Sequence, residues 1–319
     1  MSKSMAYNFC LLLSRLQYCE SKMPREELKS ILEGIKESCI CIGNGGSSIS
    51  SHFAKLVLEE KNGIICTHMQ PRDVLYTNLN LYKNLFAVTY RNENHGITSA
   101  LERARLNRLR TYTLTNNEKE NGLDTLLYYE TMLEKEASFI SMASTFMPMT
   151  ILLKYYMGND DLSELLDHIV TRAKKIYFDY DEEASVIEIM SGDTTYVASK
   201  LLESSITEAG LGMPIVHEKY DYCHGRSTMS YHHPNHILVY LKNGETTELD
   251  YLLLNNLPSH YKEIILLESD EEDKIIGEYD LAMKALYFCG SLALAKDKDI
   301  SKVEYSPVVK QLYRYKGDL

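Results

Sequence analysis

Long apolar runs and an excess of basic residues are both missing from this chain of 319 residues. No stretch approaches the ~20 apolar residues that a membrane-spanning helix needs. The first residues, Met1 to Tyr7, lack the charged segment, long apolar run and cleavage site of a signal peptide. The net charge is -11, from 34 basic and 45 acidic residues, and this balance attracts neither nucleic acid nor an anionic membrane. We therefore expect a cytoplasmic protein without nucleic-acid or membrane partners.

Paired cysteine spacing is also absent. The seven cysteines are scattered through expected strands and helices, without the CxxC spacing of a zinc site. An odd number in this arrangement favours reduced packing thiols over disulfides. What is present is the composition of a soluble globular protein, 45% hydrophobic and 25% charged, with enough length for two domains.

One glycine-rich stretch near the start of the chain is the first candidate for a binding site. Apolar residues 39–42 give way to glycines and serines over 43–51, and apolar residues then resume at helical spacing, which predicts a strand, a tight loop and a helix. Glycines let the backbone approach a ligand, while helix-opening amides and serine hydroxyls can bind a phosphate or carboxylate. The alternative is a helix capped by Ser47 or Ser48. The candidate binding residues are Gly43, Asn44, Gly45, Gly46, Ser47, Ser48, Ser50 and Ser51.

Strand and helix patterns alternate along the chain, which predicts parallel sheets. The expected strands are 39–42, 64–66, 85–89 and 110–115, then 186–190, 236–241 and 263–267. The expected helices include 9–18, 25–37, 97–108, a long stretch over 128–156 broken near Pro148, and later 196–209 and 278–295. The polar residues 158–161 indicate a boundary between domains at 1–160 and 161–319. Two similar strand-loop-helix units suggest an internal duplication.

Loops at the carboxyl ends of parallel strands share one edge of a sheet, where ligands bind. The loop over 89–95 offers the Thr89 hydroxyl, the Asn94 amide and the Arg91 guanidinium, which can hold an oxyanion through two parallel hydrogen bonds. The alternative is a surface loop in which Asn94 caps the next helix. Thr194, in the loop 191–195 of the second half, is a further candidate for binding substrate.

Two residues of the second half are candidates for proton transfer. Glu208 lies near the expected end of a helix, where the negative dipole end disfavours an ionised carboxylate and raises its pKa. His224 follows in an expected loop, where its imidazole can act as acid or base. A solvated Glu208 and a turn residue at His224 are the alternatives. A metal site on the histidines at 232, 233 and 236 is disfavoured because Pro234 interrupts a helix there, and the acidic run 269–273 is expected to be a solvated loop.

With these residues in place, the chain resembles the sugar isomerase (SIS) family in its double-domain arrangement, over most of its length from Ser38 onward. The stretch 43–47 resembles the glycine-rich entry of the first SIS domain. Residues 89–94 occupy the place of the family's phosphate loop, although only Glu93 is identical to it. Glu208 matches the family's catalytic glutamate, and His224-Gly225 matches its downstream His-Gly pair. Ser205 stands where the aminotransferases of the family have a lysine.

The resemblance implies two SIS domains, each a parallel sheet flanked by helices in a flavodoxin-like three-layer sandwich. It further implies a homodimer, no cofactor and no metal, with a site formed by the first-domain loops, Glu208 and a His224 that a partner subunit can supply. Lys310 is the candidate for the lysine of the family's closing segment.

The expected activity is that of an isomerase, deaminase or deglycase acting on a phosphorylated or otherwise anionic sugar or sugar-amine. Ring opening would be followed by proton transfer between adjacent carbons. His224 would assist ring opening, Glu208 would move the proton, and Lys310 would polarise the carbonyl or assist the amine. The alternatives are a non-catalytic sugar-phosphate sensor and a degenerate SIS pair that serves as an interaction protein.

Overall fold

The computed structural model of the chain describes residues 4–90, 95–117, 125–158, 161–177, 186–192, 194–233, 235–303 and 307–308. These residues divide into two compact units, each built around one sheet. The first-sheet unit holds the described residues of 6–137 and 141–166, and the second-sheet unit holds those of 4–5, 138–140 and 167–303. The expected boundary at the polar residues 158–161, between domains 1–160 and 161–319, stays a prediction.

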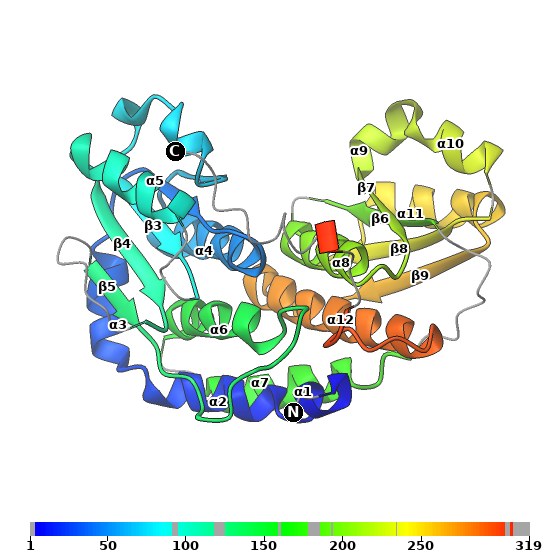
Figure 1. Ribbon diagram of the computed structural model, residues 1–319. Helices are drawn as coiled ribbons and strands as arrows, with labels where there is room; N and C mark the ends of the chain where they lie inside the picture. Colours follow the sequence, from blue (N-terminus) through cyan, green and yellow to red (C-terminus); the bar gives the residue numbers. More distant parts are fainter. Residues whose placement is uncertain are drawn as a thin grey trace. The chain divides into compact units, whose positions relative to one another are not determined.

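The first-sheet unit contains five parallel strands in the order β2-β1-β3-β4-β5 (Figure 1). They are β1 (Cys39–Ile42), β2 (Cys66–Met69), β3 (Asn84–Val88), β4 (Arg110–Thr115) and β5 (Thr125–Tyr128). The chain runs from β1 to one edge and from β3 to the other, so the sheet has its topological switch point between these two strands. Ligands bind at such points in open α/β sheets. The glycine-rich loop follows β1 and the Thr89 loop follows β3, which places both at this switch point.

Helices cover both faces of the first sheet. The helices in this half of the chain are α1 (Met5–Cys10), α2 (Leu12–Lys22), α3 (Arg25–Glu33), α4 (Gly46–Asn62), α5 (His95–Leu106), α6 (Ala143–Met157) and α7 (Leu162–Ala173), with the short 3-10 turns η1 (Asp73–Leu75) and η2 (Leu79–Leu81). Residues 167–173 of α7 belong to the second-sheet unit. Ile40, Ile42 and Leu85 pack against α5 on one face. On the other face α4 contacts β1, β2 and β3, and α6 packs on α4. Each layer therefore buries a different set of alternating strand residues.

The expected long helix over 128–156 is wrong, because Tyr128 ends β5 and the helix begins only at Ala143. The start is fixed by the Glu136 carboxylate, which accepts hydrogen bonds from the amides of Met142, Ala143 and Ser144 at 2.9 to 3.0 Å. A carboxylate at a helix N-terminus also meets the positive end of the dipole. Pro148 lies inside α6, so the expected break there is also wrong.

A buried lysine joins α6 to the N-terminal helices. The Lys154 ammonium donates to the carbonyl oxygens of Glu20 and Met23 at 2.6 and 2.9 Å and lies 3.0 Å from the Glu20 carboxylate. The two carbonyls belong to the C-terminal end of α2, where a positive charge is favourable. The ion pair and the two hydrogen bonds compensate the desolvation of the ammonium.

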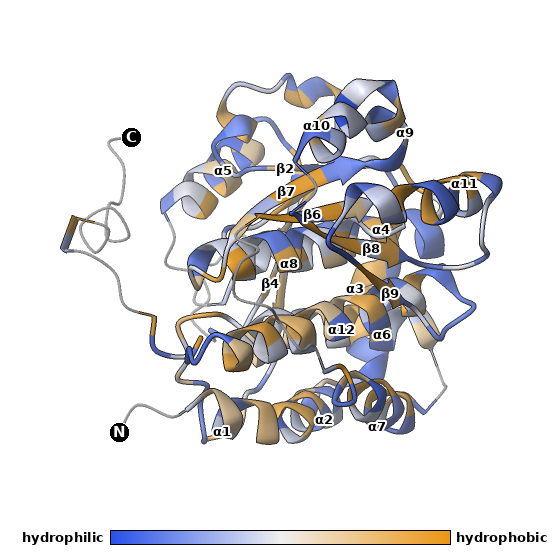
Figure 2. Ribbon diagram, turned by 90° about the vertical axis from the view of Figure 1, so that its right-hand side faces the viewer, coloured by the Kyte–Doolittle hydropathy of each residue, from blue (hydrophilic) through white to orange (hydrophobic). Residues whose placement is uncertain are grey.

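The second-sheet unit contains four parallel strands in the order β7-β6-β8-β9. They are β6 (Val186–Ser191), β7 (Met213–Glu218), β8 (Ile237–Lys242) and β9 (Glu263–Glu268). The helical elements are α8 (Tyr196–Glu208), α9 (Lys219–Asp221), η3 (Tyr222–Arg226), α10 (Ser227–His232), α11 (Glu248–Asn256), η4 (Leu257–His260) and α12 (Lys274–Ala295). β8 is buried along its length, as its apolar colouring in Figure 2 illustrates.

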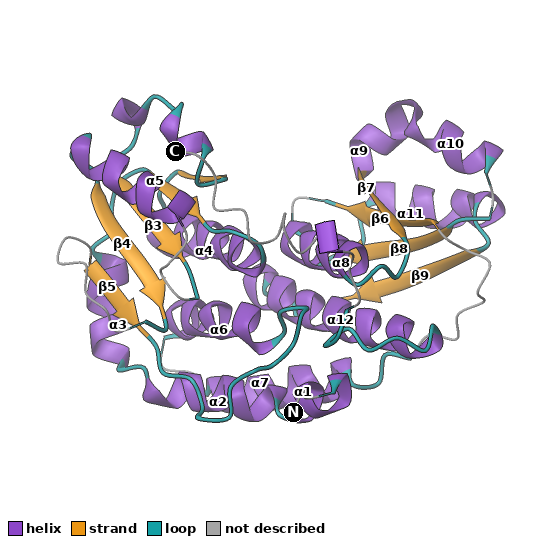
Figure 3. Cartoon of the chain, viewed as in Figure 1, coloured by secondary structure: helices purple, strands orange, loops and turns teal. Residues whose placement is uncertain are grey.

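Both faces of the second sheet are covered as well. Leu238 and Tyr240 of β8 pack with Leu253 of α11 on one face. On the other side, α8 packs on α12 and contacts β6 and β7, while α12 contacts β9. Figure 3 shows the same alternation of strands and helices in both units. The expected α/β class with two parallel sheets flanked by helices is therefore confirmed.

The expected acidic loop is more than a solvated segment. Glu271 pairs with Arg172, whose Nε lies 3.4 Å from the Asp270 carboxylate. Lys284 of α12 donates to Asp270 at 2.5 Å and lies 3.1 Å from the buried Asp280. These charges hold the end of β9 against α12. None of the helices in the described part of the chain has the length and apolar character needed to cross a membrane.

Candidate functional site

The loop after β1 is closed so tightly that two of its positions exclude any side chain. A Cβ on Gly43 would lie 2.1 Å from the Ser47 carbonyl oxygen, and one on Gly46 would lie 2.4 Å from Thr145 Oγ1. Gly45 has φ +55°, a conformation that favours glycine. The amides of Ser47 and Ser48 donate back to the carbonyls of Asn44 and Gly45 at 3.1 and 2.9 Å. These two amides therefore form the turn.

The alternative of a serine-capped helix does not match this loop. The N-cap of α4 is Gly45, which has no side chain to make a capping hydrogen bond. Glycine is a weaker N-cap than serine, so the start of α4 is less stable than a serine at this position would make it. A helix N-terminus without its own cap is a suitable place for an anion.

The serine hydroxyls expected to face a ligand divide into two groups. Ser50 Oγ is buried and donates to the Thr145 carbonyl at 2.8 Å, and Ser51 Oγ donates to the Ser48 carbonyl at 2.9 Å. The expectation for Ser50 and Ser51 is therefore wrong, because both hydroxyls are used inside the protein. The hydroxyl of Ser47, half-buried on the first turn of α4, makes no hydrogen bond to the residues that the structure describes.

A histidine that the sequence did not single out lies directly below the loop. His68 of β2 has its Nε2 atom 3.3 Å from Ser48 Oγ and 3.1 Å from Ser51 Oγ, and its ring lies 4.8 Å from that of His52. Burial lowers the pKa of His68, so it is neutral near pH 7. The sequence could have pointed to His68 through its position two residues after Cys66, which places both side chains on the same face of a strand.

The loop after β3 is described only at its start. Thr89 is buried, and its amide donates to the Leu114 carbonyl at 3.0 Å, continuing the β3 to β4 ladder. Arg91 and Asn94 lie outside the described residues, as does Lys310. Their expected roles in binding and catalysis stay predictions.

The corresponding loop of the second-sheet unit is held by side chains. Thr195 Oγ1 accepts the Gly192 amide at 2.8 Å, and the exposed Thr194 accepts Asn243 Nδ2 at its carbonyl at 2.8 Å. A Cβ on Gly192 would lie 3.7 Å from the Lys219 side chain, so Lys219 lies across this loop. The loop is therefore ordered by its own contacts, and the role of Thr194 stays a prediction.

Lys219 is engaged in a buried ion pair. Its ammonium donates to Asp250 Oδ1 at 2.6 Å, and the Tyr240 hydroxyl donates to the same oxygen at 2.6 Å. Burial alone would raise the pKa of Asp250, but the hydrogen bonds from Lys219, Tyr240 and Thr247 outweigh it and hold that pKa well below its usual range. Asp250 is thus a fixed negative charge that positions the Lys219 side chain.

The N-terminus of α8 already holds a carboxyl group. The buried Glu278 of α12 accepts a hydrogen bond from the Ala198 amide at 3.0 Å, and burial raises its pKa to about 8. The protein supplies this helix end with its own acceptor. In this respect the α8 loop differs from the loop that opens α4, where the N-cap is a glycine.

Glu208 and His224, the candidates for proton transfer, are both exposed. Glu208 is the exposed last residue of α8, and its carboxylate accepts a hydrogen bond from Ser204 Oγ at 2.6 Å. His224 is exposed within η3, where Gly225 has φ +109° and interrupts the helical turns. The expected loop at His224 is thus a helical segment broken at the His-Gly pair. Their catalytic roles stay predictions.

A buried polar network lies beneath the segment that carries His224. The Glu188 carboxylate of β6 lies 2.7 Å from His236 Nδ1 and 3.0 Å from His217 Nε2, and it accepts the Tyr261 hydroxyl at 2.7 Å. Burial raises the pKa of Glu188, but these three partners lower it below its ordinary value overall. Among the described residues no three His, Cys, Asp or Glu side chains form a group that could hold a metal ion. His236 instead pairs with the Glu188 carboxylate.

The network continues to both ends of the His224 segment. The Tyr222 hydroxyl lies 2.9 Å from that of Tyr261 and 2.6 Å from Ser230 Oγ. Tyr222 begins η3 and Ser230 lies in α10, so this chain of contacts fixes the backbone on either side of His224. Sequence reasoning missed the network because its members lie 39 and 73 residues apart at the Tyr222 to Tyr261 and Glu188 to Tyr261 contacts.

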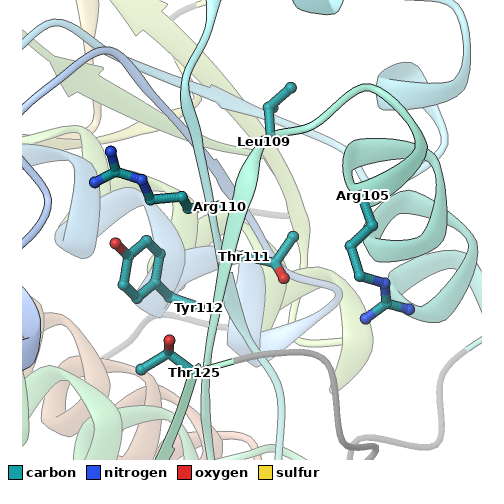
Figure 4. A pocket seen from close by; sticks show the side chains of 6 residues that line it. All are labelled: Arg105, Leu109, Arg110, Thr111, Tyr112 and Thr125. Carbon is teal, nitrogen blue, oxygen red and sulfur yellow. The ribbon is translucent and has the colours of Figure 1, made fainter.

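A cavity of about 300 Å³ in the first-sheet unit lies away from the strand ends that carry the expected loops. It is lined by Arg105, Leu109, Arg110, Thr111, Tyr112 and Thr125 (Figure 4). Arg110 and Thr125 begin β4 and β5, so the cavity is at the amino ends of the strands. Figure 4 shows the guanidinium groups of Arg105 and Arg110 extending to opposite sides of β4. They do not converge on one anion, and we assign this cavity no ligand.

Comparisons with known proteins identify the fold. No protein-family profile matches the chain, and no curated protein matches it by sequence. Solved structures do match. The C-terminal domain of glucosamine-fructose-6-phosphate aminotransferase from Francisella tularensis is 13% identical over 95% of this chain and 98% of its own, with a TM-score of 0.73.

Two further structures match over similar lengths. Glucosamine-6-phosphate deaminase from Thermotoga maritima is 16% identical over 91% of this chain and 97% of its own, with a TM-score of 0.69. Tagatose-6-phosphate ketose/aldose isomerase from Escherichia coli is 12% identical over 95% of both chains, with a TM-score of 0.68. The resemblance expected from the motifs is thereby confirmed at the level of fold: this chain has the double sugar isomerase (SIS) fold of these sugar-phosphate proteins.

Proposed function

We propose that the protein binds an anionic sugar, either a sugar phosphate or a sugar-amine phosphate, and converts it by aldose-ketose isomerisation, deamination or deglycation. The observation that carries the proposal is the glycine-closed N-terminus of α4, whose N-cap is Gly45, at the switch point of the first sheet. The fold supports the substrate class, because the similar structures are named for isomerisation, deamination or amination of phosphorylated sugars.

The anion would contact the bare backbone of the loop at Gly45 and Gly46 and the Ser47 hydroxyl. The positive end of the α4 dipole contributes ~0.3 to 1 kcal/mol per charge to such binding when exposed, and up to ~2 kcal/mol in a partly buried geometry. The chain as a whole is acidic, with a net charge of -11. Binding therefore depends on this local field and on hydrogen-bond geometry, because the overall charge repels anions.

Chemistry would follow ring opening, in which His224 would transfer a proton to or from the ring oxygen. Glu208 would then move a proton between adjacent carbons, and Lys310 would polarise the carbonyl or assist the amine. Glu208 is the last residue of α8, and its exposed carboxylate can reach a bound substrate without a rearrangement of the helix. We further propose that the protein is a cytoplasmic homodimer, as the family resemblance implies, and that it needs no cofactor.

The test is a thermal-shift screen of hexose phosphates, hexosamine phosphates and fructosyl-amino-acid phosphates, followed by assay of each ligand that raises the melting temperature. A positioned acid or base contributes ~100-fold to ~10,000-fold in rate, so Glu208→Gln should reduce turnover by that factor and leave the ligand-induced shift intact. Glu203→Gln, on the same helix beside Lys200, is the matched control and should retain turnover.

The other outcomes of this experiment would each favour a different alternative function. Binding without conversion by the unaltered protein would favour a sugar-phosphate sensor. No shift with any anionic sugar would favour an interaction protein. Unchanged turnover in Glu208→Gln would exclude Glu208 as the proton-transferring group.

A further inference from the structure

Three buried cysteines lie together on one face of the first sheet. Cys39 and Cys41 are two residues apart on β1, and Cys66 opens β2 as the registered partner of Cys39. Alternate residues of a strand share a face, and registered partners on neighbouring strands lie side by side. The Cys39 thiol donates to the Ile40 carbonyl at 3.6 Å. The three cysteine side chains therefore lie side by side on one face of the sheet.

The three thiols differ in chemistry. The neighbouring Cys39 and Cys41 side chains lower the pKa of Cys66, which favours its thiolate form. Burial raises the pKa of Cys39, and its cysteine neighbours raise that of Cys41. Together with its greater exposure, this assigns Cys66 as the nucleophile of the group.

Access to solvent follows the same order. Cys39 and Cys41 are fully buried on the inner strand β1, while Cys66 keeps 5% of its surface exposed on β2, an edge strand of the sheet. The preceding residue, Ile65, is 75% exposed. A small oxidant approaching the sheet edge therefore meets Cys66 first.

Backbone spacing selects which thiol can join Cys66. Neighbouring strands lie ~4.8 Å apart, so Cys39 and Cys66 fall within the ~4.4 to 6.8 Å Cα separation of a disulfide. Cys41 is displaced by two further residues of ~3.3 Å each, which places it roughly 8 Å from Cys66 and beyond the ~7 Å limit. Cys39 and Cys41 point the same way along one strand, so their Cβ atoms are roughly 6.6 Å apart, against roughly 4.8 Å for the registered pair and ~3.5 to 4.5 Å in a disulfide. Of the three pairs, Cys39 and Cys66 therefore need the smallest movement to form the bond.

We propose that this group is an oxidation site, in which hydrogen peroxide or another small hydroperoxide converts Cys66 and Cys39 into a disulfide across β1 and β2. The Cys66 thiolate attacks the peroxide, the O–O bond breaks, and Cys66 becomes a sulfenic acid as hydroxide leaves. The Cys39 sulfur then attacks the Cys66 sulfur, forming the S–S bond and releasing the sulfenic oxygen as water. In sum, two thiols and one hydrogen peroxide give one disulfide and two waters, the two electrons passing from sulfur to oxygen.

The site is separate from the proposed sugar chemistry. The new bond would close a loop that contains the Gly43 to Gly46 turn and the whole of α4. Cys41 would stay reduced, because it is out of reach of either partner once the bond has formed. The proposal thus assigns three neighbouring cysteines three different roles: Cys66 is the nucleophile, Cys39 is the resolving thiol, and Cys41 is a neighbour that stays reduced.

The experiment treats the full-length chain carrying Cys10→Ser and Cys223→Ser, which removes both exposed thiols, with dilute hydrogen peroxide. Remaining thiols are then alkylated, and the intact mass and the unreduced peptides are measured by mass spectrometry. The expected result is the loss of two hydrogen atoms, a peptide cross-linked through Cys39 and Cys66, and an alkylated Cys41. A reductant should reverse all three changes.

Matched variants complete the test. Cys41→Ser should still form the cross-link, whereas Cys66→Ser and Cys39→Ser should not, and circular dichroism melting would verify that each variant is folded. In Cys39→Ser, Cys66 should progress to the sulfinic acid and gain two oxygen atoms, because its resolving thiol is missing. An unaltered mass in the folded starting protein would overturn the proposal. A cross-link through Cys41 or Cys19, or sulfinic acid at Cys66 without any cross-link, would overturn it as well.

Discussion

Replacing Glu278 by glutamine tests which of two opposing forces governs a buried carboxyl group. Desolvation favours the neutral acid, while the Ala198 amide and the α8 dipole favour the carboxylate. Desolvation prevails and raises the pKa from 4.5 to about 8. Glu278 is therefore protonated in the folded protein at pH 7 and ionised in the unfolded chain.

The free energy of unfolding depends on pH here because the pKa of Glu278 differs between the folded and the unfolded chain. Unfolding releases the Glu278 proton between pH 4.5 and about 8, so the free energy of unfolding falls as the pH rises through this window. Each pH unit costs about 1.4 kcal/mol, which amounts to about 3 kcal/mol at pH 7 relative to pH 4.5. Glutamine cannot ionise and keeps an oxygen for the Ala198 amide. Its NH₂ group replaces the buried Oε2, which has no hydrogen-bond partner among the described residues. Burying this unpaired donor costs ~1 to 3 kcal/mol, which reduces the stability that the variant gains over the parent at neutral pH.

Urea unfolding followed by tyrosine fluorescence suits this measurement, because the chain has 24 tyrosines and no tryptophan. Between pH 5 and pH 8 the free energy of unfolding of Glu278→Gln should fall less steeply than that of the parent, by about 1.4 kcal/mol per pH unit. Equal slopes in the two proteins would refute the reasoning, since they would show that the helix end keeps Glu278 ionised. Glu272→Gln, in the exposed part of the acidic run, is the control and should leave the slope unchanged.

Two further predictions concern the loop after β1 and the network around Glu188. Gly43→Ala places a Cβ against the Ser47 carbonyl, and the resulting strain should lower stability by ~1 to 3 kcal/mol, seen as a lower melting temperature. Tyr261→Phe removes the donor to Glu188 and the hydroxyl that Tyr222 contacts, which should cost about 1 to 3 kcal/mol in urea unfolding.

Both predictions have internal controls. Gly244→Ala also replaces a glycine, but the added Cβ meets no atom, so any cost there reflects the backbone conformation at φ +78° alone. A smaller loss for Gly43→Ala than for Gly244→Ala would contradict the steric argument. Tyr231→Phe removes a hydroxyl from an exposed tyrosine and should be near neutral, and equal losses at positions 231 and 261 would contradict the account of the network.

The sequence predicts the inner strands well, but among the edge strands it predicts only β9 closely. β1 and β4 were predicted with the bounds that the structure shows, because a run of buried apolar or β-branched residues has no competing pattern. β7 was missed because Pro214 and half-exposed neighbours break that pattern. The structure allows Pro214 because β7 is an edge strand, where one side needs no ladder hydrogen bonds.

The candidate site was predictable only where its residues are local. The glycine loop and the helix after it were predicted from adjacent residues, and the structure forms them as expected. The direction of each serine hydroxyl was not predictable, since Ser50 donates to the Thr145 carbonyl, 95 residues away. The partnership of His68 with Ser48 and Ser51 likewise depends on how β2 lies against α4. Such contacts arise from packing between elements, which periodicity does not encode.

The Lys154 contacts have a consequence for the order in which the chain folds. Its partners Glu20 and Met23 precede it by 134 and 131 residues. During synthesis, α2 is therefore complete long before Lys154, whose ammonium binds the carbonyls at the C-terminal end of that helix. Bringing such distant residues together requires closing a large loop, which slows folding. During synthesis the first helices must therefore wait for α6 before they can dock. A chain shortened from its start past Met23 would leave the Lys154 ammonium buried without its counter-charge, so the N-terminal helices are an obligatory part of the first-sheet unit.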